Sequence, residues 1–163
     1  MRPEEWAKLG CETYPGDLVE IGLGIGETTR ELFPVAKHFG RKLIGIDPFD
    51  DMMPATYKYS YEEFAKNNFD PEVFIHHRKS SLCKSSWDVC HTLLSFAFVD
   101  GLQYYGAVLN DLMMVSHACI ICVDDYDRMS PESEVPEAIK LFLKWYKFDL
   151  KNEGRWAILT KSY

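Results

Sequence analysis

The 163-residue sequence predicts an α/β fold: a mostly parallel sheet with helices on both faces. Short apolar runs of strand length alternate with segments whose apolar residues recur at helical spacing. The first of these runs, residues 17–21, opens into a loop that carries three glycines. The last two runs are separated by the turn signal of residues 151–154, which predicts an antiparallel hairpin at the end of the sheet.

The expected elements follow one another along the chain in strand–helix order. Strands are expected at residues 17–21, 42–46, 73–76, 96–99, 118–123, 146–150 and 155–160. Helices are expected at residues 3–11, 27–38, 57–65, 87–94 and 104–116, and from the capping sequence Ser130-Pro131-Glu132 to about Trp145. Within the second helix, Pro34 predicts a kink or a fresh start.

The segment after the second strand has two interpretations. Tyr57, Tyr61 and Phe64 keep the spacing of an amphipathic helix that packs against the sheet. The alternative is a cap over a substrate pocket, to which Met52 and Met53 would add adaptable contacts.

Size and charge restrict the class of protein. A chain of this length suits a single domain, expected over residues 1–163. The formal net charge of −7 argues against a nucleic acid as the main partner. The N-terminus lacks the apolar region of a signal peptide, and no apolar run has the length of a bilayer span. Five cysteines without a framework spacing suggest a reducing compartment, so a cytoplasmic location is expected.

A glycine loop with acidic residues around it predicts a site for a nucleoside-containing ligand. The first strand carries Glu20 and leads into Gly22, Gly24 and Gly26, and Asp47 follows the second strand. Glycines let the backbone approach the ligand closely, and the aspartate can accept hydrogen bonds from ribose hydroxyls. A glycine-rich turn without a ligand is the alternative.

The spacing of the glycines decides against a dinucleotide. The third glycine of a G-x-G-x-x-G fingerprint would fall at Glu27, where a carboxylate would repel a pyrophosphate. The observed E-x-G-x-G-x-G pattern instead resembles the first motif of class I S-adenosylmethionine (SAM)-dependent methyltransferases. The resemblance implies that Glu20 lies near the methionine part of SAM and that Thr28 meets its carboxylate. It also implies that the glycines pass beneath the ligand and that Asp47 holds the ribose.

A second group of acidic residues follows the fourth and fifth strands. Asp100 comes directly after one strand, and Asp124 and Asp125 come after the next. Because the carboxyl ends of such strands face the ligand crevice, we expect these side chains to converge there. Converging carboxylates repel each other unless a cation joins them, and Mg²⁺ is the most suitable ion. The alternative is structural, with the aspartates capping the turns that follow the strands.

The residues around these aspartates extend the resemblance. The segment from Phe98 to Leu112 resembles the signature F-[IV]-D-G-x-H-x-Y-x-x-V-x-x-D-L, and residues 121–126 resemble [VI]-x-[HD]-D-Y. Together with the glycine loop, these matches over roughly residues 15–160 resemble the small-molecule O-methyltransferases that include macrolide-sugar and aminocoumarin-sugar enzymes. The resemblance implies a Rossmann-like seven-stranded methyltransferase sheet with a C-terminal hairpin. It also implies Asp100, Asp124 and Asp125 as Mg²⁺ ligands.

The sequence departs from that signature beside the first aspartate. Leu102 stands where sugar methyltransferases often have an acidic residue, and Gln103 stands where the wider family often has histidine. Neither side chain can serve as a general base near neutral pH, so the catalytic base is unassigned. The resemblance also implies a place near the adenine for Ser81, and Asp100 completes the expected cofactor set. His76 and His77 are interpreted as surface or capping groups, with a crevice-facing histidine as the alternative.

Two cysteine groups are weighed as metal sites and set aside. Cys119 and Cys122 lie three apart on an expected strand, so they point to opposite faces and cannot share an ion. Cys83, Cys90 and His91 lack a fourth ligand at the usual spacing for zinc.

The sequence therefore predicts a SAM-dependent methyltransferase that acts on an oxygen of a small molecule with the help of a divalent metal ion. Two alternatives are a SAM-binding protein without methyltransferase activity and a metal-independent methyltransferase that acts on another acceptor. No nucleic-acid or membrane partner is expected, and assembly into a homo-oligomer stays open.

Overall fold

Strands and helices alternate almost throughout the computed structural model, which describes residues 1–49, 61–127 and 134–162. The strands are β1 (Asp17–Ile21), β2 (Leu43–Ile46), β3 (Phe74–His77), β4 (Leu94–Val99), β5 (Ile120–Val123), β6 (Phe148–Glu153) and β7 (Trp156–Lys161). The helices are α1 (Pro3–Thr13), α2 (Glu27–His38), α3 (Tyr61–Ala65), α4 (Lys84–Val89), α5 (Tyr105–Met114) and α6 (Val135–Trp145).

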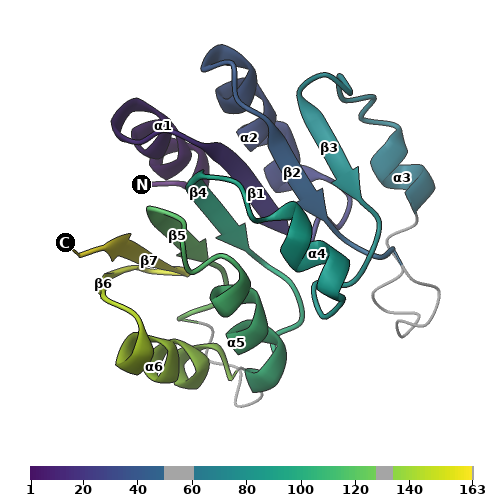
Figure 1. Ribbon diagram of the computed structural model, residues 1–163. Coiled ribbons are helices and arrows are strands. Elements are labelled where there is room, and N and C mark those ends of the chain that lie inside the picture. The colour runs from purple at the N-terminus through teal and green to yellow at the C-terminus, as the bar shows by residue number, and fades with distance from the viewer. Residues whose placement is uncertain (50–60, 128–133, 163) are drawn as a thin grey trace.

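The strands form one seven-stranded sheet in the order β3-β2-β1-β4-β5-β7-β6. The pairs from β3 to β5 are parallel, whereas β7 runs antiparallel to both β5 and β6. The order reverses between β1 and β4, so the carboxyl ends of these two central strands flank the crevice where ligands bind in such sheets. Figure 1 shows this central position and the hairpin at one edge. The predicted architecture is confirmed.

Helices cover both faces of the sheet, and each face has its own apolar core (Figure 1). Helices α1 and α2 pack together and contact β4 and β2 on one face, whereas α5 and α6 pack against each other on the other face. Strands β1, β4 and β5 are buried along almost their whole length, because they are covered on both sides.

Helices α4 and α2 differ from the prediction. The helix expected at 87–94 is α4, which begins at Lys84 and ends at Val89. Leu94 belongs instead to β4, where it pairs with Asp17 of β1, and this pairing requires an extended chain. Helix α2 runs through Pro34 without a break, although the proline cannot donate the hydrogen bond of that turn.

The last third of the chain also needs corrections. Strand β6 extends to Glu153, so the hairpin turn consists of Gly154 and Arg155 rather than residues 151–154. The expected helix start at Ser130 lies outside the described residues, and the described helix begins only after the non-helical Glu134. Met52, Met53 and residues 57–60 of the helix expected at 57–65 also lie outside the described residues, and α3 contains residues 61–65 of that helix.

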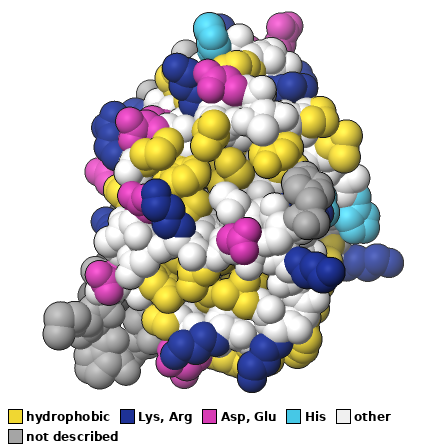
Figure 2. Space-filling view, turned by 90° about the vertical axis from the view of Figure 1, so that its left-hand side faces the viewer, with side chains coloured by type: hydrophobic (Ala, Val, Ile, Leu, Met, Phe, Trp, Pro, Cys, Tyr) yellow, Lys and Arg dark blue, Asp and Glu magenta, His cyan; other side chains and the backbone are white. Residues whose placement is uncertain are grey.

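The hairpin edge of the sheet presents hydrophobic side chains to the solvent. Figure 2 shows bands of hydrophobic side chains on this side of the molecule, separated by polar and charged groups. The exposed large hydrophobic residues of α6 and β6 include Trp145 and Leu150. Among the described residues, none of the helices combines the length and hydrophobicity that crossing a bilayer requires.

Candidate functional site

The glycine loop connects the carboxyl end of β1 to the start of α2. Gly22, Gly24 and Gly26 all have positive φ, as this tight connection requires. At Gly22 the φ of 84° coincides with a close approach to β4: a Cβ there would lie 2.6 Å from the carbonyl carbon of Asp100. The loop therefore packs directly on the main chain of Asp100, which joins the two parts of the predicted site.

A residue outside the predicted set braces the same loop. The Asn67 side-chain amide donates hydrogen bonds to the backbone carbonyls of Ile25 (3.0 Å) and Phe64 (2.7 Å). The Arg30 guanidinium donates in turn to the Asn67 side-chain carbonyl at 2.9 Å. Thr28, half-buried, opens α2 just beyond the loop, as the motif predicts.

Glu20 is a fully buried carboxyl in the middle of the site. Its exposed fraction is 0%, and neither side-chain oxygen has a hydrogen-bond partner among the described residues. Burial raises the pKa of Glu20 well above its usual value, and the charges of Asp100 and Asp47 raise it further. The nearby hydroxyl of Thr29 lowers this pKa in part, but its geometry falls short of a hydrogen bond. A buried acceptor without a partner is costly, and such groups concentrate at functional sites.

Asp47 fixes the loop to the end of β2. One carboxylate oxygen accepts the N–H of Leu23 at 2.9 Å, and the other accepts the N–H of Phe49 at 2.8 Å. Each carboxylate oxygen can accept more than one hydrogen bond, so these backbone contacts orient Asp47 and leave capacity for a hydroxyl.

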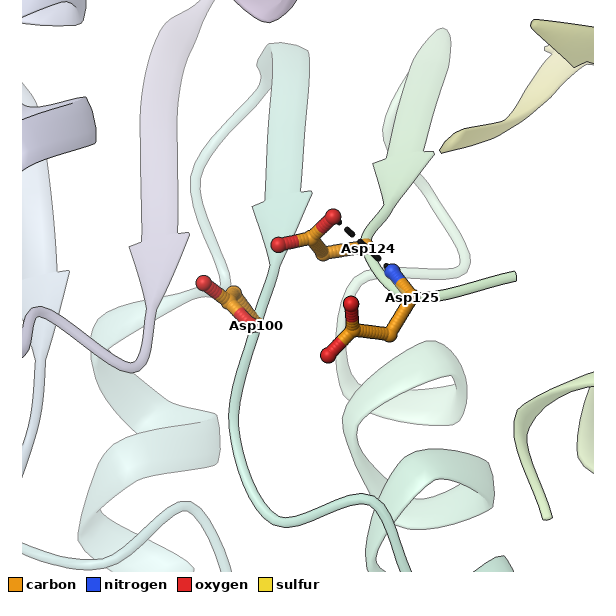
Figure 3. Close-up of side chains that lie close together, drawn as sticks. All are labelled: Asp100, Asp124 and Asp125. Carbon is orange, nitrogen blue, oxygen red and sulfur yellow. Dashed lines mark hydrogen bonds between the residues drawn. The ribbon is translucent and has the colours of Figure 1, made fainter. Parts of the chain in front are cut away.

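The strand-end aspartates converge, as the sequence predicts. Each of Asp100, Asp124 and Asp125 offers a carboxylate oxygen, and these three oxygens lie within 4.8 Å of one another. Figure 3 shows Asp100 approaching from the end of β4 and the other two from the end of β5. The Asp125 N–H donates to the Asp124 carboxylate at 2.8 Å, and Asp125 itself has a left-handed φ of 55°. The backbone turn thus directs both side chains toward Asp100.

Burial strengthens the repulsion among the carboxylates of the cluster. Asp124 and Asp125 are each 4% exposed. Burial, together with the charges of these two neighbours, raises the pKa of Asp100 to about 8. The three carboxylates therefore repel one another in the folded protein, as the sequence predicts for converging acids without a bound cation.

A cation already sits in the cluster, and sequence reasoning missed it. The Arg155 guanidinium, from the β6–β7 turn, binds both carboxylate oxygens of Asp124, with 2.5 Å between Nε and Oδ1. Its Nε lies 3.6 Å from an oxygen of Asp125. The pairing with Asp124 raises the pKa of Arg155. No local pattern marks this arginine, because hairpin turns commonly carry charged residues.

The two atypical residues beside Asp100 differ in their surroundings. The side-chain amide of Gln103 donates a hydrogen bond to the Asp125 carboxylate. Leu102 is 42% exposed and contributes no polar atom. Gln103 therefore orients an aspartate, and neither residue supplies a base.

Ser81 lies next to another buried acid, Asp111. Its carbonyl accepts a hydrogen bond from the Asn110 side chain at 3.3 Å, and Asn110 also donates to Asp111 at 3.2 Å. Burial raises the pKa of Asp111 to about 6, while hydrogen bonds from Ser81 and Asn110 oppose that rise. The loop after β3 is thereby tied to α5.

The other candidate groups stay outside the acidic cluster. His76 packs among the rings of Phe49, Tyr61 and Phe64, and burial lowers its pKa. Within residues 1–49, 61–127 and 134–162, the side chains that gather with metal-binding geometry are those of the three aspartates. Cys83 is exposed and Cys90 is buried, so the zinc interpretation finds no support among them.

The chain resembles solved methyltransferase structures over almost its whole length. The apo structure of CalS11, a TDP-rhamnose 3′-O-methyltransferase of calicheamicin biosynthesis, aligns with a TM-score of 0.70 and 15% identity over 96% of this chain and 76% of that one. A putative caffeoyl-CoA O-methyltransferase from Staphylococcus aureus aligns with a TM-score of 0.61 and 14% identity, over 98% and 80%. The O-methyltransferase TomG from Streptomyces achromogenes, bound to SAM, gives 0.59 and 12%, over 98% and 79%.

No protein-family model and no curated protein matches the sequence. At these identities, the likeness to solved structures concerns the fold. The chain therefore has the fold of the class I SAM-dependent methyltransferases, and O-methyltransferases of that class are among its structural neighbours.

Proposed function

We propose that the chain transfers a methyl group from SAM to an oxygen of a small molecule, with a divalent cation bound by Asp100, Asp124 and Asp125. One observation carries the proposal: the glycine loop and the three aspartates meet at the carboxyl ends of β1, β4 and β5, where Gly22 packs against Asp100. A SAM bound over the loop would thus lie beside the acidic cluster.

The proposed cofactor site uses the groups that line the loop. Asp47, oriented by two backbone N–H groups, would accept the ribose hydroxyls. Glu20, whose carboxyl has no hydrogen-bond partner among the described residues, would face the methionine part of SAM, where an ammonium group would favour its ionised form. Thr28 would meet the methionine carboxylate at the start of α2. Ser81 would lie on the adenine side.

The three carboxylates suit a hard cation such as Mg²⁺, which prefers oxygen ligands. A bound cation would lower the pKa of an acceptor hydroxyl, so that no strong protein base is needed beside Leu102 and Gln103. The chain's own contribution would be to hold the hydroxyl in line with the methyl–sulfur bond and to exclude water. Gln103 would keep Asp125 aimed at the cation.

The experiment measures S-adenosylhomocysteine formation from SAM with TDP-rhamnose and with caffeoyl-CoA, the acceptors for which two structural neighbours are named. Turnover is expected with Mg²⁺, and Asp124→Ala is expected to abolish it while SAM binding stays within about threefold of the wild type. Turnover at the wild-type rate in excess chelator would contradict the metal part of the proposal.

A second function, SAM binding without methyl transfer, is favoured by one observation. Arg155 and Gln103 both bind carboxylates of the cluster, so the acids are engaged within the protein itself. Under this reading, SAM binds with the same contacts, and no acceptor yields S-adenosylhomocysteine.

A further inference from the structure

Arg155 binds the Asp124 carboxylate oxygens that a metal ion in the acidic cluster would use as ligands. Its Nε and Nη2 groups donate to the two oxygens of the Asp124 carboxylate, and the aspartate is almost completely buried beneath it. Such fork-shaped pairing is the strongest geometry available to arginine and a carboxylate. The buried acid therefore has a counterion that belongs to the protein.

The backbone of Arg155 is held in place, whereas its side chain reaches into solvent. The Tyr126 N–H donates to the Arg155 carbonyl at 2.8 Å, so the hairpin turn is tied to the segment just after Asp125. Beside the turn, Ala157 of β7 pairs with Val123 of β5. The Arg155 side chain is 61% exposed. Its guanidinium can therefore leave Asp124 by rotating about side-chain bonds, without unpairing the strands.

A metal ion and the guanidinium need the same oxygens. Small divalent cations bind along the lone pairs of carboxylate oxygens. One oxygen of Asp124 already accepts two N–H groups, from Asp125 and from Arg155, and the other accepts a second N–H of Arg155. Two cations at one carboxylate would also repel each other. From these contacts we propose that Arg155 is an internal competitor of the divalent cation, which binds the three aspartates only when the guanidinium swings away from Asp124.

This inference rests on the proposed function in one respect, since it takes the aspartates as the metal ligands. It adds a residue that controls how readily the site is loaded. Because Arg155 must first release Asp124, the apparent affinity for the cation is the intrinsic affinity multiplied by the fraction of molecules in which Asp124 is free. When the cation is bound, the released Arg155 guanidinium would lie at the rim of the site.

The experiment measures binding of Mn²⁺ to the full chain, from the electron paramagnetic resonance signal of the free ion, without SAM or acceptor. We expect Arg155→Gln, which removes the charge, to bind Mn²⁺ at least about tenfold more tightly than the wild type, equivalent to about 1.4 kcal/mol. Arg155→Lys keeps the charge but cannot donate two parallel hydrogen bonds to Asp124, so we expect it to bind Mn²⁺ about threefold more tightly than the wild type. Lys8→Gln, a change of equal charge on an exposed residue of α1, should leave the affinity unchanged.

Equal or weaker Mn²⁺ binding by Arg155→Gln than by Lys8→Gln would overturn the inference. Should Arg155→Gln lose its folded circular dichroism spectrum, Arg155→Lys decides instead, and an affinity equal to that of the wild type overturns the inference. Absence of Mn²⁺ binding in all of these proteins also overturns it. Titration of SAM into the same samples separates this failure from that of the proposed function, because SAM binding does not depend on Arg155 in either account.

Discussion

Replacing Gly22 by alanine tests how tightly the glycine loop is built onto the fourth strand. Two costs add at this position. A residue with a Cβ loses roughly 1–2 kcal/mol in the left-handed backbone region, where Gly22 has a φ of 84°. The Cβ would also lie 2.6 Å from the carbonyl carbon of Asp100 and closer still to its oxygen. Relieving such an overlap with main-chain atoms costs about 1–3 kcal/mol more.

Gly40 provides a matched control for this substitution. It has a φ of 64°, and an added Cβ there would meet no atom within 4 Å. Gly40→Ala therefore carries only the backbone cost, and the loss of flexibility in the unfolded chain is the same in both variants. Gly22→Ala should be less stable than Gly40→Ala by about 1–3 kcal/mol.

Urea unfolding followed by tryptophan fluorescence gives the free energy of unfolding of each variant. Because the overlap acts on the main chain of Asp100, Gly22→Ala should also weaken SAM binding, and Gly40→Ala should not. Equal stability of the two variants would refute the close contact between the loop and β4. So would unchanged SAM binding by Gly22→Ala.

Two further predictions concern buried acids. Burial raises the pKa of Asp111 from 3.8 to about 6, so its stabilising contribution is complete below pH 3.8 and is lost as the pH rises through about 6. Asp111→Asn should remove this pH dependence of stability and stabilise the protein at pH 7 by at most about 3 kcal/mol. Urea unfolding from pH 4 to 8 measures the effect. A pH profile of stability equal to that of the wild type would contradict the role of Asp111. The pKa of Glu20 is raised well above its usual value, so the wild type should lose stability as the pH rises through that pKa. Glu20→Gln should not show this loss, yet it should bind SAM at least about tenfold more weakly by calorimetry, and wild-type affinity would exclude Glu20 from the SAM site.

Much of the architecture could be predicted from the sequence, because each buried strand is a short apolar run. The convergence of the aspartates was predictable for a related reason: parallel strands end at one edge of the sheet, and Asp100 and Asp124 each follow such a strand. The contact between Gly22 and Asp100 has the same cause, because these residues follow the adjacent parallel strands β1 and β4.

Two errors in the prediction arise from contacts between residues far apart in the sequence. The boundary near Leu94 was wrong because pairing with Asp17 in the sheet overrides the helical spacing of the preceding residues. Arg155 was missed because its partner Asp124 lies 31 residues earlier in the chain and meets it only through the antiparallel pairing of β7 with β5. Contacts of this kind leave no periodic signal in the sequence.

The central claim is that the loop between β1 and α2 binds SAM, and calorimetric titration of SAM into the full chain tests it most directly. We expect one SAM to bind per chain. We also expect an affinity at least about tenfold lower for Asp47→Asn, whereas Asp149→Asn, a matched change on the exposed face of β6, leaves it unchanged. Absence of SAM binding by the wild type would contradict the account. Equal affinities of the two variants would contradict the role of Asp47.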